Sequence, residues 1–241
     1  MHNFVEAIKF IGRDGQIPGA PPLPTLVHLT LGTLKIAGIG IALALVIALP
    51  IGVLLGHIHR GSFAAINVGN IWRALPSLAV LAIGVAFLGI GLGNVELALV
   101  VLAVPPVITN AYVAIDQVDR DVVDAARGMG LSGWQILRRV ELPLGIPLIF
   151  AGIRTSALFV VSTTTIAALT GYSGSLGDII NNETSYHLAG VLGAAICIAA
   201  LALLVEGVLA LVQLGLTPAG VKLAAREETA MARTPIVTES A

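Results

Sequence analysis

The chain is poor in charged residues and in cysteine, and each shortage excludes a class of protein. Only 11% of its 241 residues are charged, whereas 56% are hydrophobic. A water-soluble domain of this size cannot enclose so much apolar surface in one core, which favours insertion into a lipid bilayer. The single cysteine, Cys197, lies in an apolar run, so the sequence predicts neither an internal disulfide nor thiol redox chemistry.

Lysine is also scarce, and its positions exclude a phosphate-binding loop. Lys9, Lys35 and Lys222 each follow an apolar residue rather than the glycine of a Gly-Lys-Ser/Thr loop. We expect no catalytic residue and no cofactor in this chain, so any ATP must be hydrolysed by another protein. His57 and His59 lack a third ligand nearby, which makes a solvated turn a better interpretation than a metal site.

Long apolar runs, separated by polar or glycine-rich breaks, are what the chain does contain. A membrane-spanning helix needs about 20 apolar residues, because each residue adds about 1.5 Å to cross a hydrocarbon layer roughly 30 Å thick. Runs close to this length occur at 36–56, 74–90, 95–114, 146–169 and 188–214. The sequence therefore predicts an all-α integral membrane protein with about five transmembrane helices.

Basic residues predict how these spans are oriented, since Lys and Arg of short loops favour the cytoplasmic side. With five spans, one side of the membrane receives nine of them: Arg60, Arg73, Arg120, Arg127, Arg138, Arg139, Lys222, Arg226 and Arg233. The other side receives only Lys9, Arg13 and Lys35. We therefore expect a cytoplasmic C-terminus and an external N-terminus.

The two ends of the chain are expected to lie outside the membrane domain at 25–216. Residues 1–24 form an extracytoplasmic lead without the features of a cleavable signal peptide. Within it, an amphipathic stretch at 4–11 is suited to the outer membrane surface and precedes a proline-rich, non-helical stretch containing Pro18, Pro21, Pro22 and Pro24. The charged tail at 217–241 has too little apolar content to fold alone and is expected to be cytoplasmic and disordered.

The connection at 118–143 is predicted to form two short helices. Asp119 suits the start of the first helix, and Gly130 can adopt the left-handed conformation that ends it. Ser132, followed three residues later by a glutamine, fits a capping box for the second helix, and Pro143 is expected to stop it. The expected product is a helix-turn-helix held between two membrane spans.

A helix-turn-helix in this place has three possible uses. DNA binding is disfavoured, because both ends are tethered to the bilayer and several carboxylates would repel phosphate, so no nucleic-acid partner is expected. An amphipathic loop resting on the membrane surface is the plain structural alternative. The functional interpretation is a docking site for a cytoplasmic partner.

The spacing of this connection resembles the EAA loop of binding-protein-dependent ABC importer permeases. That pattern is Glu-Ala-Ala, three residues, Gly, nine residues and Ile-x-Leu-Pro. The residues assigned to it and to ATPase coupling are Asp124, Ala125, Ala126, Gly130, Leu131, Val140, Leu142 and Pro143. Asp124 replaces the family's Glu and Val140 its Ile. In the family the loop inserts into a groove on the ATPase, so a bulky side chain at Ala125 or Gly130 should uncouple hydrolysis from transport.

The resemblance also implies the partners of the chain. They are ATP-binding subunits that carry ATP and magnesium, a second permease subunit that is the same or a related chain, and an extracytoplasmic solute-binding protein. The surroundings are the lipid of a bacterial cytoplasmic membrane, and the fold is that of type I ABC importer permeases. Alternating access driven by the ATPase is the mechanism implied.

Several segments resemble the osmoprotectant branch of the family, whose solutes include glycine betaine, choline, carnitine and proline. They lie at 73–79, 88–91, 106–110 and 151–155. The segment at 171–177 departs from the Gly-Ala-Gly-Gly-Leu-Gly loop that relatives usually show. Branches importing sulfonates, phosphonates or amino acids stay open, as does an ion-coupled secondary transporter, although Glu206 alone is thin support for the latter.

A few polar side chains fall within the predicted spans. Arg154 and Glu206 lie at similar depth and could form an ion pair; alternatively Arg154 snorkels to the surface and Glu206 faces a water-filled cavity. Candidates for the translocation path are Asn110, Ser162, Thr163 and Thr164. The hydroxyls could instead bond their own helix, and the amide could bond a neighbouring one.

Overall fold

The computed structural model describes residues 2–17, 24–59, 61, 67, 69 and 75–221. Every regular element among these residues is helical. The elements are α1 (His2–Gly12), α2 (Leu26–His57), α4 (Ser77–Leu88), α5 (Leu92–Asp116), α6 (Arg120–Gly128), α7 (Gly133–Ile136), the π-helical turn η1 (Leu137–Glu141), α8 (Leu142–Ile166), the 3-10 turn η2 (Ala167–Thr170), α9 (Gly177–Asn181) and α10 (Glu183–Leu216).

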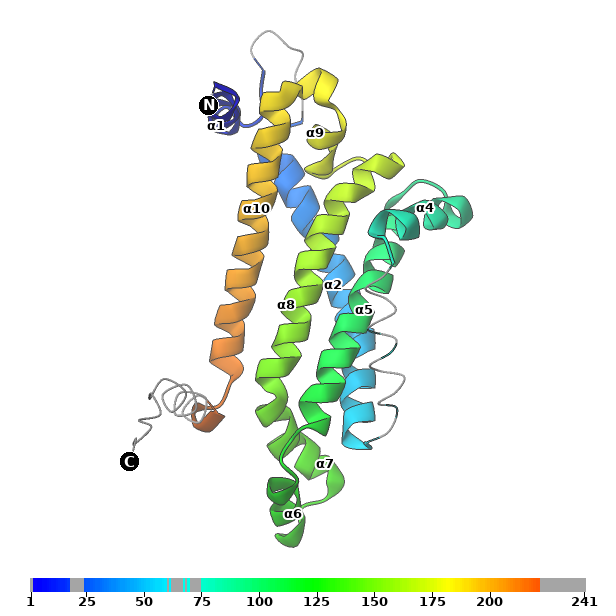
Figure 1. Cartoon of the computed structure of the whole chain (residues 1–241), viewed down its shortest axis with the longest axis vertical. Helices are drawn as coiled ribbons and strands as arrows, with labels where there is room; N and C mark the ends of the chain where they lie inside the picture. The colour runs from blue at the N-terminus through cyan, green and yellow to red at the C-terminus, as the bar shows by residue number, and fades with distance from the viewer. Residues whose placement is uncertain are drawn as a thin grey trace, which may run out of the picture.

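Four helical stretches in the described part are long and apolar enough to cross a bilayer: α2, α5, the continuous stretch from α7 to η2, and α10. They run along the long axis of the molecule, with α5 packed between α2 and α8 (Figure 1). Each contains one of the spans expected at 36–56, 95–114, 146–169 and 188–214. The all-helical membrane fold is therefore confirmed.

The prediction of a transmembrane span at 74–90 is wrong. Its described part, α4, has 12 residues and is about 18 Å long, well short of a hydrocarbon layer roughly 30 Å thick. Pro76 precedes the helix and Gly89, with φ 74°, ends it. In Figure 1, α4 lies across one end of the bundle rather than along it.

Helix α4 lies at the end of the bundle opposite to the one where α2 ends (Figure 1). Helix α2 ends at His57, at the end of α5 that leads into α6. Farther along, Gly69 packs directly against Thr109 in the body of α5. At the start of α5, Asn94 Nδ2 donates to Leu81 O of α4 at 3.3 Å. The described part of the 74–90 run therefore lies at one end of the bundle and does not cross it.

Small residues allow the long helices to pack closely. A Cβ added at Gly52 of α2 would lie 2.7 Å from Ala111 Cβ of α5. A Cβ at Gly152 of α8 would lie 2.6 Å from Asn110 Cβ of α5. Such close approach is typical of helices that associate inside a bilayer, where van der Waals contact replaces the hydrophobic drive.

The amphipathic stretch expected at 4–11 forms α1, which lies beside the first turns of α10 (Figure 1). Phe10 is buried there, edge to face with Tyr186 at a centroid distance of 6.2 Å. Phe4 and Ile8 are exposed on the other face, so the outer membrane surface stays a prediction for that face. Of the proline-rich stretch only Pro24 is described, and residues 222–241 of the tail also lie outside the described part.

Candidate functional site

The connection between α5 and α8 begins with a capped helix. The Asp119 carboxylate accepts a hydrogen bond from Asp121 N at 2.9 Å, as the helix start predicted at this position requires. Gly130 has φ 83°, a left-handed conformation that glycine adopts without steric cost. Both sequence predictions are confirmed, and the turn reverses the chain toward α7.

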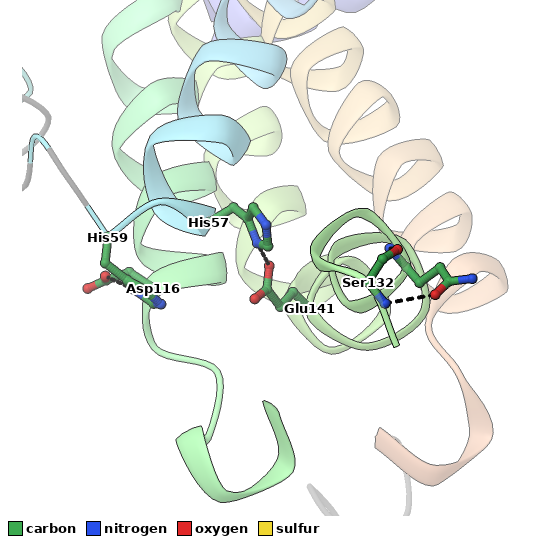
Figure 2. A network of polar contacts seen from close by, with 6 residues as sticks. His57, His59, Asp116, Ser132 and Glu141 are labelled. Atoms are coloured by element: carbon green, nitrogen blue, oxygen red, sulfur yellow. Dashed lines mark hydrogen bonds and ion pairs between the residues drawn. The ribbon is translucent and has the colours of Figure 1, made fainter. Parts of the chain in front are cut away.

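The second helix is also capped as expected. Ser132 N donates to Gln135 Oε1 at 2.8 Å, and Gln135 N donates to Ser132 Oγ at 3.4 Å, which completes a capping box (Figure 2). The stop expected at Pro143 is wrong, because α7 continues through η1 into α8. Pro143 lies in the first turn of α8, where η1 changes the hydrogen-bond register and a missing N–H is tolerated.

We call residues 118–141 the α6–η1 segment. Its two arms enclose a small core of Val118, Val123, Ala126 and Ile136, against which Leu131 and Val140 pack. Leu142 packs instead with the cluster at the junction of α5 and α8, and Pro143 is half-buried. Asp124, Ala125 and Gly130 are exposed. The predicted coupling residues therefore divide into a group that holds the segment together and a group that faces outward.

The two most exposed large apolar side chains of this segment were not singled out as contact residues by sequence reasoning. Met129 is 75% exposed and Trp134 is 65% exposed. Trp134, Gln135, Arg138 and Arg139 border a surface hollow of about 420 Å³. The signal was available, because a helix-turn-helix that turns Ala126 and Ile136 inward leaves these two positions outward.

The two histidines near the end of α2, at positions 57 and 59, bond different carboxylates (Figure 2). His57 Nδ1 lies 2.6 Å from Glu141 Oε2, and His59 Nδ1 lies 2.8 Å from Asp116 Oδ1. The solvated turn expected here describes His59 better than His57, whose partner Glu141 is only 2% exposed. Among the described residues, no group of three or more His, Cys, Asp or Glu could hold a metal ion.

Within the bundle, the structure brings Arg154 of α8 and Glu206 of α10 together. Arg154 Nε donates to Glu206 Oε1 at 2.7 Å, and the Arg154–Glu206 ion pair is partly buried, with 34% and 26% of the side chains exposed. Arg154 Nη1 also donates to Gln213 Oε1 at 3.2 Å. Gln213 was missed from the sequence, since a single amide near a helix end carries no distinctive pattern.

The candidates for the translocation path do not share one surface. The hydroxyls of Ser162 and Thr164 donate to the carbonyl four residues earlier, at 2.9 Å and 2.8 Å, and so does the amide of Asn110, to Pro106 O at 2.8 Å. Thr163 is buried and borders a cavity of about 110 Å³, which is also lined by Gly69, Leu75, Ser77, Leu102, Pro106 and Phe159. Of these four candidates, Thr163 lines the cavity directly, and Asn110 reaches it through its hydrogen-bond partner Pro106.

The sequence model of the family described as "Binding-protein-dependent transport system inner membrane component" matches residues 48–217. This range runs from within α2 to the residue after α10 and includes the α6–η1 segment. The chain belongs to this family. It is a multi-pass membrane permease and a transporter subunit rather than an enzyme, and in such systems separate ATPase subunits hydrolyse ATP.

Curated relatives of this permease cover most of its length. OpuCB of Bacillus subtilis, a glycine betaine/carnitine/choline transport system permease protein, is 36% identical over 190 residues, 78% of this chain and 87% of the relative. OpuBB of the same organism, a choline transport system permease protein, is 35% identical over 92% of this chain and 97% of its own. OsmW of Salmonella typhimurium, an osmoprotectant import permease protein, is 28% identical over 82% and 94%.

Solved structures similar to this permease confirm its fold. One, described as inward-facing conformations of the MetNI methionine ABC transporter, superposes with a TM-score of 0.69 at 22% identity, covering 80% of this chain and 96% of the other. An amino acid ABC transporter with histidines gives a TM-score of 0.63 at 18% identity, covering 87% and 97%. The type I importer fold expected from the EAA-like spacing is thereby confirmed.

Proposed function

We propose that this permease forms the membrane path of an ATP-driven importer for osmoprotectants that carry a quaternary ammonium group, such as glycine betaine, choline or carnitine. The observation that carries the proposal is the set of relatives, 33–36% identical, whose names give these solutes. The resemblance also included proline as a solute, which those names do not mention.

We assign solute selection to an extracytoplasmic binding protein rather than to this chain. Quaternary ammonium groups are recognised by several aromatic faces that converge on the cation. Aromatic residues make up only 5% of the sequence. At the α1 end of the bundle, Phe10 and Tyr186 are buried against each other and offer no open cage. Trp134 lies at the opposite end, on α7 (Figure 1).

We assign the α6–η1 segment to contact with the ATPase. The segment protrudes at one end of the bundle (Figure 1) and exposes Ala125, Met129 and Trp134 on its surface. Arg138 and Arg139 lie at the same end, which supports a cytoplasmic position under the positive-inside rule. On this assignment α1 and α9 are extracytoplasmic, the C-terminus is cytoplasmic, and ATP and magnesium are held by the partner subunits in a bacterial cytoplasmic membrane.

The test is uptake by proteoliposomes that contain this permease, its ATPase and its binding protein, with radiolabelled glycine betaine, choline and carnitine outside. ATP enclosed in the vesicles should drive accumulation of at least one of them, and an ion gradient without ATP should not. Taurine, a phosphonate and methionine serve as comparison solutes from other import branches. Uptake of one of these instead, or gradient-driven uptake without the ATPase, refutes the proposal.

A further inference from the structure

The contact between His57 and Glu141 joins α2 to the segment that we assign to ATPase docking. Glu141 occupies the position that the Ile-x-Leu-Pro part of the EAA pattern leaves unspecified, so the resemblance gives it no role. We propose that Glu141 and His57 are positioning residues, through which movement of the α6–η1 segment is transmitted to α2. The inference depends on the proposed docking function of that segment.

Glu141 is held where a carboxylate needs a partner. It is the last residue of η1 and is 2% exposed, and its Oε2 lies 2.6 Å from His57 Nδ1. This separation places the imidazole and the carboxyl group in direct hydrogen-bond contact. A carboxylate buried this deeply is strongly destabilised without a partner. The contact with His57 therefore persists for as long as Glu141 stays buried.

The His57 ring lies between two parts of the α6–η1 segment. One nitrogen faces Glu141, and the other, Nε2, lies 3.5 Å from where a Cβ at Gly133 would be. The ring is thus enclosed by the start of α7 and the end of η1. Elsewhere α2 packs mainly along α5 and α8, and Leu45, Leu49 and Val53 of α2 join an apolar cluster that includes Leu137 of η1. The imidazole adds a directional polar link between the two.

The consequence concerns which spans respond to docking. Helix α8 follows the α6–η1 segment through the continuous backbone. Helix α2 has no such covalent route, since it is joined to the segment only through the rest of the chain. The His57–Glu141 contact supplies a direct connection, which makes α2 and α8 move together when the ATPase displaces the segment.

A second histidine pair provides a matched control. His59 and Asp116 are joined at 2.8 Å, but their side chains are 41% and 32% exposed and link the end of α2 to the end of α5, outside the α6–η1 segment. Exposed pairs contribute little to stability. The other charged groups near both pairs border one cavity of about 240 Å³, whose lining includes Glu141, His59, Arg120, Asp124 and Arg127. In the described part, Arg127 pairs with Asp124.

The decisive variant is Glu141→Leu, because it removes the polar link without leaving an unpaired buried charge, and replacing buried polar groups by apolar ones of similar size is often tolerated. In the proteoliposome assay we expect ATP hydrolysis to be retained while solute transported per ATP falls about fivefold or more, the lower end of typical coupling effects. Glu141→Gln, whose amide can still bond the imidazole, should restore most of the ratio. Asp116→Leu should keep the wild-type ratio.

A wild-type ratio for Glu141→Leu overturns the inference. So does an equal fall in hydrolysis and uptake accompanied by loss of assembled complex or a lower melting temperature in detergent, since that indicates a structural role only. Failure of the proposed function is distinguishable, because the wild-type permease itself would then show no ATP-driven uptake of the quaternary ammonium solutes.

Discussion

Ala125 offers the sharpest test of the docking surface. It lies on α6 with its side chain exposed, and it is not part of the core that Ala126 and Ile136 form. Replacing it with tryptophan should therefore change folding stability by no more than about 0.5 kcal/mol, the usual range for surface substitutions. Any larger effect must come from a partner.

The expected effect on the partner is large. If the ATPase closes around this face, an indole in place of a methyl group blocks close approach, and loss of a central contact typically costs about 2 to 4 kcal/mol, or about 30- to 1,000-fold in affinity. Affinity of the detergent-solubilised permease for its ATPase, measured by biolayer interferometry, checks this. The melting temperature should stay unchanged.

The control is Ile8→Trp, which places the same side chain on an exposed position of α1 at the other end of the bundle. Substitution of Gly130 is less informative, because its φ of 83° adds about 1 kcal/mol of backbone strain to any effect on docking. Full ATPase affinity and full uptake in a correctly inserted Ala125→Trp permease would refute the docking assignment.

Three further predictions concern stability. Reversing the charge of Arg154 or of Glu206 alone should destabilise the permease by about 1 to 3 kcal/mol. Reversing both charges should recover part of this loss in thermal unfolding, and a double variant no more stable than either single one contradicts the pairing. Gly152→Ala should cost about 1 to 3 kcal/mol, because the new Cβ would lie 2.6 Å from Asn110 Cβ. Burial raises the pKa of Asp178 in α9 above its usual range, so its contribution to stability falls as pH rises through that pKa. The melting temperature should therefore rise on acidification from neutral pH more in the wild type than in Asp178→Asn, and an identical pH profile for both would contradict this.

Local signals in the sequence predicted local structure well. Asp119, Gly130 and Ser132 each act through the backbone of residues next to them, so their spacing alone was sufficient. Four of the five spans predicted from hydropathy each lie within a helical stretch long enough to cross the bilayer. The prediction at 74–90 was wrong because an apolar run does not reveal where the chain turns, and Pro76 and Gly89 limit the helix to 12 residues.

Contacts between distant parts of the chain were harder to foresee. The depth of Arg154 and Glu206 in their spans suggested a pair, because an ionisable group inside a bilayer needs a partner. The His57–Glu141 contact joins residues 84 positions apart and had no such signal, since a glutamate beside the membrane surface is unremarkable in sequence. Its burial follows from the packing of η1 within the folded segment, which one sequence alone does not reveal.

The continuity of α7, η1 and α8 has a mechanical consequence. From Gly133 to Thr170 the backbone forms a single helical rod of 38 residues, about 57 Å from end to end at 1.5 Å per residue. Its lower tip bears Trp134 and its upper tip adjoins the turn leading to α9 (Figure 1). Because the backbone stays helical through η1, a displacement imposed at the lower tip is passed along the same helix to the upper one, so the two ends of the bundle are linked through one piece of backbone.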